Sequence, residues 1–377
     1  MEENSTGLSK QLPAGAASGN QALSKAKSAK QDEFYTQLED ISNELKHYKT
    51  QLRGKTILCN CDDPYESNFF KYFALNFNSL GLKKLVATSY EKSTITGGQL
   101  PLFEIEGLKP EGKEPYAIEI NEVGDQDGDG AIDLADVEYL LKHDANTVRP
   151  LKSNGLYNGG DFRSEECVKY LKQADVVVTN PPFSLFREYV AQLVEHHKQF
   201  LIIGNLNAIH YKEIFKLIKE NKLWLGESIH SGDREFRVPD HYPLEAAGFR
   251  VDENGTKYIR VKGVRWFTNM DNPKRHEELP LYKKYSPTEY PTYDNYNAIE
   301  VSKTGEIPCD YDGLMGVPDS FVDKFNPDQF EMIGIPFGNL GKSIGVRKNY
   351  RGRTDIAITK EGKSRCPYSR LIIRRKK

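Results

Sequence analysis

The stretch that decides the fold is ADVVVTNPPFSLFREY, residues 174–189. Its first six residues, 174–179, form a short apolar run rich in β-branched side chains, which is typical of a buried strand. From residue 186 onward, apolar side chains recur at the spacing of an amphipathic helix. Pro181 and Pro182 stand between the two and fix φ while removing two backbone donors. The stretch therefore predicts a strand, a rigid turn and a helix.

The same alternation of strands and helices continues on both sides. The expected strands are 56–61, 84–88, 174–179, 200–204, 223–225 and 264–268, and the expected helices are 38–52, 67–80, 186–200 and 211–221. Thr36 and Glu39 have the T-x-x-E spacing of a capping box, which predicts where the first helix begins. This pattern predicts an α/β fold with a parallel sheet covered by helices on both faces. Because ligands bind beyond the carboxyl ends of such strands, we expect the chemistry after Cys61, near Asp161 and after Thr179.

Three parts are expected along the chain. Residues 1–30 are small, polar and without periodicity, and predict a disordered tail. Residues 31–270 carry the alternating pattern and include an insertion at 91–150. From about residue 271, proline, tyrosine and glycine become frequent and periodicity weakens, so we expect a smaller, irregular C-terminal module over 271–377.

Composition excludes several classes of protein. The 377 residues are 38% hydrophobic and 28% charged, and no apolar run approaches the roughly 18 residues of a membrane span, so no membrane partner is expected. Residues 1–30 lack the apolar region of a signal peptide. The five cysteines are too few and too scattered for a disulfide scaffold and fit a reducing compartment. We therefore expect a cytoplasmic protein.

Charge is distributed unevenly. The whole chain carries −2, but residues 342–377 hold 13 Lys/Arg against Asp355 and Glu361, which gives that segment +11 and leaves −13 for residues 1–341. The segment also contains Tyr350 between basic residues, and cations mixed with an aromatic favour nucleic-acid binding. The alternative is a solvated basic tail.

The turn after residue 179 carries two oxygen acceptors and an aromatic ring. Asn180 offers a side-chain oxygen and Pro181 a backbone oxygen side by side, and two acceptors at that spacing can hold the two hydrogens of an exocyclic amino group. Phe183 is placed to stack on a flat ring, which suits an aminopurine. The alternative is an ordinary proline-rich strand exit.

The strand–NPPF–helix unit resembles the catalytic motif of S-adenosylmethionine-dependent methyltransferases that act on amino groups of adenine. A wider set of segments resembles the EcoRI-type adenine-specific DNA methylases of restriction–modification systems. These segments are DEFYTQ (32–37), CNCDDP (59–64), SNFFKYFALNF (67–77), GDFRS (160–164), VVVTNPPFSLFREY (176–189), FLIIGNLNAI (200–209), YKEIFKLIKENKLWLG (211–226) and LMGVPDSF (314–321). The resemblance covers roughly residues 30–330 and implies a Rossmann-like class I methyltransferase sheet.

The resemblance also implies roles for the matched residues. The implied catalytic residues, which would hold and orient a flipped adenine, are Asn180, Pro181, Pro182 and Phe183. The implied cofactor-binding residues are Phe34, Tyr35, Thr36, Cys61, Asp62, Asp63, Pro64, Asp161 and Phe162. The turn at 61–64 departs from the family's usual glycine-rich form. Two other interpretations stay open: Asp161 in a surface turn, and Asp62 and Asp63 as caps of the following helix.

The implied reaction is direct displacement, in which N6 of an adenine flipped out of duplex DNA takes the methyl group of S-adenosylmethionine. Two acceptors on the amino hydrogens would bear the growing positive charge, and no protein nucleophile is needed. The family implies a monomer and a cognate restriction endonuclease acting on the same site. Other amino-group methyltransferases, acting on RNA, guanine N2, cytosine N4 or a protein glutamine, share the motif and remain alternatives.

A second motif spans residues 125–136 and matches most positions of an EF-hand loop. The expected Ca²⁺ ligands are Asp125, Asp127, Asp129, Ala131 and Asp136. Asp136 replaces the usual glutamate at position 12, as in dockerin modules, and residues 117–123 alternate like a strand where a helix should enter. A structural Ca²⁺ site is one interpretation, and an acidic turn that caps the following helix is the other. A calcium-dependent interaction protein without enzymatic activity is a remote alternative.

Overall fold

The computed structural model describes residues 36–61, 63–64, 67–89, 115–125, 128, 130, 133–143, 148–152, 156–230, 233–238 and 248–376. An eight-stranded sheet, in the order β4-β3-β2-β1-β5-β6-β11-β7, forms its centre. The strands are β1 (Thr56–Cys59), β2 (Lys84–Thr88), β3 (Tyr116–Ile120), β4 (Val148–Pro150), β5 (Val176–Thr179), β6 (Gln199–Asn205), β7 (Trp224–Leu225) and β11 (Val264–Thr268). The expected α/β class is confirmed.

Only the middle of this sheet is parallel. The strands β2, β1, β5 and β6 run parallel to one another. On one side β3 pairs antiparallel with β2 and with β4, and on the other β11 pairs antiparallel with β6 and with β7. The sequence pattern predicted a parallel sheet, and the antiparallel edges depart from that prediction. The strand β11 enters this sheet directly from β10 of a neighbouring small sheet, through Gly263 (φ 71°).

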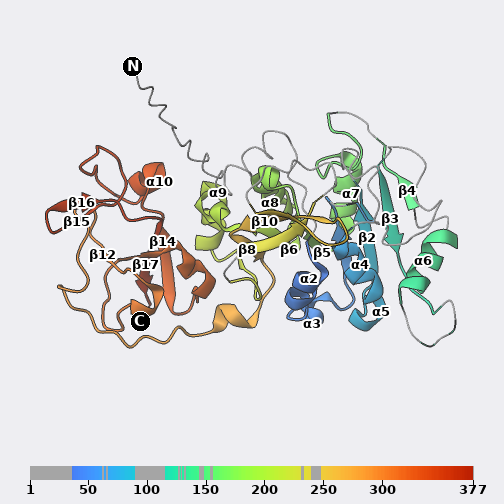
Figure 1. Cartoon of the computed structure of the whole chain (residues 1–377), viewed down its shortest axis with the longest axis horizontal. Helices are drawn as coiled ribbons and strands as arrows, with labels where there is room; N and C mark the ends of the chain where they lie inside the picture. Colours follow the sequence, from blue (N-terminus) through green and yellow to red (C-terminus); the bar gives the residue numbers. More distant parts are fainter. Residues whose placement is uncertain are drawn as a thin grey trace, which may run out of the picture.

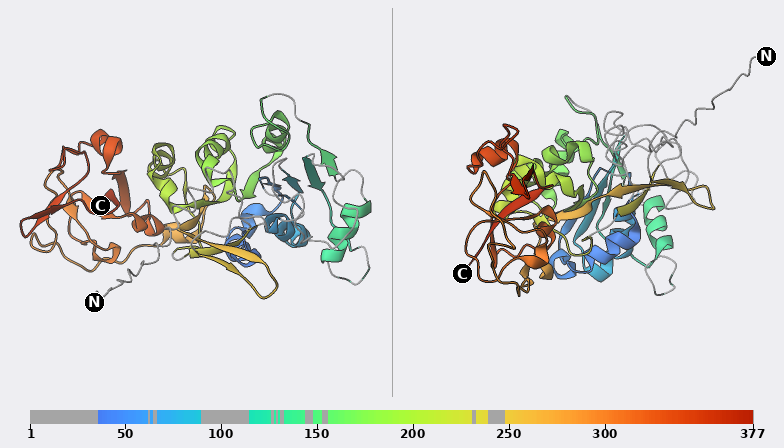
Figure 2. Two further views of the ribbon diagram at one scale, coloured as in Figure 1. Left: turned by 45° about the horizontal axis from the view of Figure 1, so that its top comes forward. Right: turned by 60° about the vertical axis from the view of Figure 1, so that its left-hand side comes forward.

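Helices cover both faces of the sheet. One face packs on α2 (Leu38–Leu45), α3 (Lys49–Leu52), α4 (Asn68–Leu75), α5 (Phe77–Leu80) and α6 (Leu134–His143). The other packs on α7 (Glu165–Gln173), α8 (Phe186–Glu195) and α9 (Lys212–Lys219). Because side chains alternate along a strand, Ile57 and Cys59 of β1 join the first core and Leu58 joins the second. Figure 2 shows the blue helices and the green helices on opposite sides of the strands.

Two predicted helices are broken where a residue leaves helical geometry. The expected helix 38–52 divides into α2 and α3 at Tyr48 (φ −116°, ψ 6°). The expected helix 67–80 divides at Asn76, whose side chain donates to the carbonyl of Tyr72 at 2.8 Å and so competes with the backbone. The predicted capping box is wrong, because Gln37 is the N-cap of α2 and makes no capping hydrogen bond through its side chain.

A small antiparallel sheet precedes β11. It has the order β8-β10-β9, formed by β8 (Asp233–Arg237), β9 (Phe249–Val251) and β10 (Lys257–Lys262). The gold strands in both views of Figure 2 show that it extends away from the central sheet.

The C-terminal module contains more regular structure than its weak periodicity suggested. A four-stranded sheet in the order β12-β13-β17-β14 is formed by β12 (Ile299–Glu300), β13 (Met315–Pro318), β14 (Phe330–Gly334) and β17 (Arg370–Arg375). The hairpin β15 (Ile358–Lys360) and β16 (Lys363–Arg365), the helix α10 (Gly338–Ser343), and the 3₁₀ turns η3 (Pro273–His276), η4 (Thr304–Glu306) and η5 (Asp319–Lys324) complete it. Figure 1 shows this module at one end of the molecule and β4 with α6 at the other.

The basic segment is therefore not a free tail. Its last strand, β17, lies between β13 and β14, and Leu371, Ile372 and Ile373 are buried. Three of its arginines pair with acids of the same module: Arg370 with Glu300, Arg374 with Glu331 and Arg375 with Asp312. The solvated-tail interpretation is wrong for this part of the segment.

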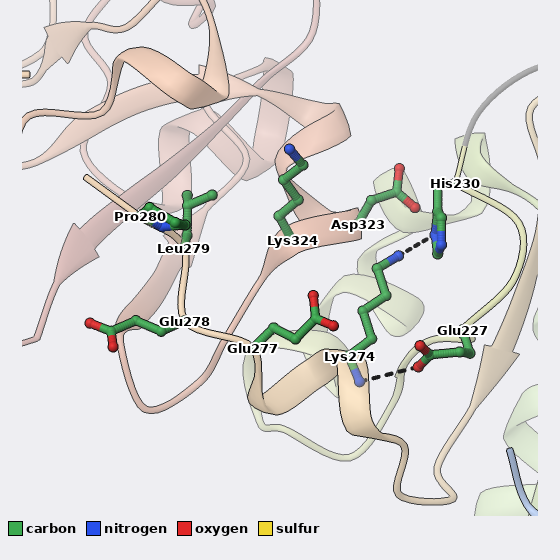
Figure 3. A pocket seen from close by; sticks show the side chains of 9 residues that line it. All are labelled: Glu227, His230, Lys274, Glu277, Glu278, Leu279, Pro280, Asp323 and Lys324. Atoms are coloured by element: carbon green, nitrogen blue, oxygen red, sulfur yellow. Dashed lines mark hydrogen bonds between the residues drawn. The ribbon is translucent and has the colours of Figure 1, made fainter. Parts of the chain in front are cut away.

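A buried ion pair joins the module to the central sheet. Arg265 of β11 donates to Asp323 of η5 at 3.0 and 3.2 Å, and both residues are under 9% exposed. Beside this pair lies a pocket of about 360 Å³ whose lining includes Glu227, His230, Lys274 and Lys324 (Figure 3). Burial lowers the pKa of Lys274, whose ammonium contacts the ring of His230. None of the predicted site residues lines this pocket.

No helix of the described residues is long and apolar enough to cross a membrane.

Candidate active site

Two predicted turns meet at one edge of the central sheet. The strands β1 and β5 are parallel neighbours, with Ile57 opposite Val176 and Leu58 opposite Val177. The residues that follow them, from Asn60 and from Asn180, therefore leave the sheet side by side. The Thr179 hydroxyl donates a hydrogen bond to the carbonyl of Asn60 and ties the two turns together. The sequence placed both at the carboxyl ends of strands, and the structure brings them into contact.

The turn at 180–183 is a compact elbow. Asn180 is 6% exposed and Pro181 is buried. Pro182 keeps extended geometry (φ −55°, ψ 122°), and its carbonyl accepts a hydrogen bond from the Leu185 amide at 2.9 Å. Within the described residues, the carbonyl of Pro181 accepts no hydrogen bond. Its oxygen therefore keeps its acceptor capacity at the point where the chain leaves β5.

Phe183 begins a 3₁₀ turn, η1 (Phe183–Leu185), directly before α8. Its ring is half-buried and packs against the core under α4. The residue is thus not fully buried, as a stacking role requires.

The turn after β1 is held by its own network. Tyr189 of α8 is fully buried and donates through its hydroxyl to Asn60 Oδ1. Burial raises the pKa of Tyr189 well above its ordinary value, so the phenol keeps the proton that it donates. Cys61 adopts φ 77°, a left-handed conformation that a residue other than glycine seldom takes. The family's usual glycine is absent here, but the backbone still makes the sharp turn.

Asp63 does not cap the following helix. Its Oδ1 accepts a hydrogen bond from the Tyr116 hydroxyl at 2.7 Å, and the N-cap of α4 is Ser67, whose hydroxyl accepts from the Phe70 amide at 3.4 Å. The capping interpretation of Asp63 is therefore wrong. Pro64 is buried in the same turn, and Asp62 lies outside the described residues.

Thr36 lies over this turn. Its carbonyl accepts a hydrogen bond from Asn68 Nδ2 at 2.8 Å, next to the beginning of α4. Its hydroxyl is buried and makes no hydrogen bond with any described residue. A buried hydroxyl with spare capacity is what a polar ligand would satisfy. Phe34 and Tyr35 lie outside the described residues.

Asp161 is buried, not exposed in a surface turn, so that alternative is wrong. It accepts three hydrogen bonds from Arg163: from the amide and Nε at 2.9 Å to Oδ1, and from Nη2 at 2.8 Å to Oδ2. Hydrogen bonding to Asp161 raises the pKa of Arg163, which also donates to Glu188 of α8 at 2.9 Å. These hydrogen bonds fix the carboxylate in position.

Phe162 contacts helix α8 through both its ring and its carbonyl. Its ring meets Tyr189 edge-on, with centroids 5.0 Å apart, and its carbonyl accepts from Gln192 Nε2 at 3.0 Å. Helix α8 thus contacts the elbow, the turn after β1 and the 161–163 turn. The sequence did not single out Arg163, Tyr189 and Gln192 as members of this network. Only Arg163 had a local signal, since it directly follows the predicted pair.

The EF-hand-like loop is described in part. Asp125 accepts from the amides of Gly128 and Gly130 at 2.7 and 2.9 Å, and Asp136 accepts from the Asp133 amide at 2.9 Å. The helix expected after the loop is present as α6, and β3 precedes it. Asp127, Asp129 and Ala131 lie outside the described residues, so the Ca²⁺ site stays a prediction.

Comparison with known proteins gives a consistent result. The family described as adenine-specific methyltransferase EcoRI matches residues 22–376. The type II methyltransferase M.EcoRI of Escherichia coli is 43% identical over 361 residues, 95% of this chain and 97% of that protein. The type II methyltransferase M.MpnI of Mycoplasma pneumoniae is 37% identical, over 94% of this chain and 98% of that protein.

A solved structure of a putative RNA methyltransferase from Pyrococcus horikoshii covers 67% of this chain and 83% of its own at 10% identity, with a TM-score of 0.24, too low to support an argument. The family match and the full-length relatives do not depend on it. The chain is a methyltransferase and belongs to the EcoRI family of adenine-specific methyltransferases.

Proposed function

We propose that this protein methylates N6 of a specific adenine in duplex DNA, with S-adenosylmethionine as the methyl donor. The observation that carries the proposal is the contact between the two turns at the end of β1 and β5, where Thr179 and Tyr189 both bind Asn60. This contact holds a predicted cofactor turn and a predicted amine-binding elbow at one edge of the sheet.

The residues near the turn after β1 offer polar and aromatic groups suited to binding S-adenosylmethionine. The buried Thr36 hydroxyl has no partner among the described residues, and Asp161 and Phe162 supply a carboxylate and a ring. In this proposal Phe34, Tyr35, Thr36 and residues 61–64 would hold the cofactor, with Asp161 accepting from its adenine amine. When bound, S-adenosylmethionine supplies an electrophilic methyl group.

The elbow would act on the target base. The side-chain oxygen of Asn180 and the carbonyl of Pro181 accept hydrogen bonds from the adenine amine, and the Phe183 ring stacks on the base. Those two acceptors favour a tetrahedral, nucleophilic nitrogen and stabilise its growing positive charge. Pro182 keeps the elbow rigid, so little reorganisation is needed as the reaction proceeds.

We propose the remaining organisation from the same resemblance. Residues 31–270 would form the methyltransferase domain and 271–377 a DNA-recognition module. The chain would act as a monomer in the cytoplasm, alongside a cognate restriction endonuclease. Exposed cations on β15 and β16, namely Lys360, Lys363 and Arg365, support contact of this module with phosphates.

The Asn180→Ala variant tests the proposal. It removes one of the two acceptors, so the rate of methyl transfer to duplex DNA should fall by about 100-fold or more while cofactor affinity stays near that of wild type. Asn43→Ala, on an exposed position of α2, is the matched control and should keep full activity. Wild-type turnover by Asn180→Ala would contradict the assigned role.

A further inference from the structure

The small sheet β8-β10-β9 begins beside the candidate active site. The carbonyl of Lys262, the last residue of β10, accepts from Asn205 Nδ2 at 2.8 Å, and the carbonyl of Gly263 accepts from the Leu206 amide at 2.6 Å. Asn205 ends β6, which is the parallel neighbour of β5. The base of the small sheet is therefore one strand away from the elbow at Asn180, at the carboxyl ends of β5 and β6.

Its inner face is committed to packing. Phe236, Ile259 and Val261 are buried in the core that also contains Trp266. Arg234 lies opposite Val261 on this inner face and pairs with Asp40 of α2 at 3.4 Å. Arg237, three residues further along β8, lies on the opposite, outer face.

The segment that leads into β8 is anchored firmly. Glu44 of α2 is fully buried and accepts from the amides of Glu227 and Ser228 at 2.7 and 2.6 Å. Together with the Arg234–Asp40 pair, this fixes the small sheet to the body of the protein. Its outer face is thus held in a defined position relative to the elbow.

The outer face carries a surplus of cations. The cross-strand register places four cations and two acids on the outer face: Arg237, Arg250, Arg260 and Lys262, with Asp233 and Glu235. Arg250 pairs with Glu235 at 2.8 Å and Arg260 with Asp233 at 3.5 Å. Arg237 and Lys262 make no ion pair with any described residue, so the described part of the face carries two positive charges without an acidic partner. Same-face residues two apart on a strand are about 7 Å apart, which spreads these cations along the sheet.

We propose that this outer face docks on the sugar–phosphate backbone of the DNA duplex next to the flipped adenine. The inference rests on the proposed function, because it takes DNA as the substrate. Lys and Arg contacts to phosphate fix position and carry no sequence information. In this role the face contributes affinity and alignment of the duplex.

The variant Arg237→Gln/Lys262→Gln tests the proposal. Each phosphate contact contributes about 0.9 to the slope of log K against log salt, so losing two should lower that slope by about 1.8 for cognate and unrelated duplexes alike. Cofactor affinity and the thermal unfolding midpoint are measured on the same samples. Arg53→Gln/Lys83→Gln removes the same two charges just before β1 and β2, at the opposite edge of the sheet, and should leave the slope unchanged.

A second double variant distinguishes the effect of the two positive charges from the effect of side-chain shape. Arg237→Lys/Lys262→Arg keeps both cations and should keep the salt slope of wild type. A salt slope of Arg237→Gln/Lys262→Gln equal to that of wild type overturns the proposal. An equal loss of DNA affinity in Arg237→Gln/Lys262→Gln and in Arg237→Lys/Lys262→Arg also overturns it. Failure of the wild-type protein to methylate DNA would overturn the proposed function instead, so the two failures are distinguishable.

Discussion

At the scale of single residues, the candidate site depends on side chains that hold other groups in place. Asn180 and Pro181 could be identified from the sequence because two prolines after a buried strand leave few conformations. Tyr189 could not, since nothing local distinguishes it from a core tyrosine of an amphipathic helix. Its role follows from the neighbouring strands that bring Asn60 to its hydroxyl.

We predict that Tyr189→Phe weakens cofactor binding. The change leaves Asn60 Oδ1 buried without the phenol hydrogen bond, which costs about 1 kcal/mol and corresponds to roughly fivefold in affinity. Titration of S-adenosylmethionine by calorimetry measures it. Tyr282→Phe, at a 76% exposed position, is the control. Equal affinities for Tyr189→Phe and wild type would show that this contact does not position the cofactor turn.

At the scale of elements, the strands were easier to predict than their directions or the helix ends. Each strand of β1, β2, β5 and β6 is a short apolar run, and all are buried on both faces. The antiparallel edges could not be predicted, because direction depends on how the chain returns to the sheet. The breaks at Tyr48 and Asn76 depend on local geometry that hydrophobic periodicity does not report.

The next prediction concerns the strand β17. Deletion of residues 342–377 removes β17 from the middle of the C-terminal sheet, with three buried side chains each worth about 1.5–3 kcal/mol. It also removes the buried Val346, Ile356 and Ile358. We expect the truncated protein to show a less stable, protease-sensitive C-terminal module. The variant Lys360→Gln/Lys363→Gln/Arg365→Gln should instead keep the wild-type melting curve and lower the salt dependence of DNA binding. A truncated protein that melts like wild type would contradict the role given to β17.

At the scale of the whole molecule, the C-terminal module lies at one end of the central sheet and shares one of its two cores (Figure 1). The second core continues from α8 and α9 into the C-terminal module, so the module is packed against the sheet and not attached by a linker alone. The sequence located the change of pattern near residue 271. It could not show the Arg265–Asp323 pair that joins the two parts, because 58 positions separate its members.

We predict that Asp323→Ala destabilises the protein by about 3–5 kcal/mol, because it leaves the Arg265 charge buried without its partner. The double variant Arg265→Met/Asp323→Leu should recover a large part of that loss. Glu331→Ala breaks an exposed pair with Arg374 and should cost less than about 1 kcal/mol. Urea unfolding measures all three. A loss for Asp323→Ala no larger than for Glu331→Ala would contradict the account of this contact.

The most direct test of the central claim identifies the methylated nucleoside. The wild-type protein is incubated with duplex DNA and S-adenosylmethionine carrying a labelled methyl group, and the DNA is digested to nucleosides and separated. We expect the label in N6-methyladenine at one position of a short sequence, and none with Asn180→Ala. Label in N4-methylcytosine, or in no nucleoside of the DNA, would contradict the claim that the elbow at Asn180 presents an adenine amine for methylation.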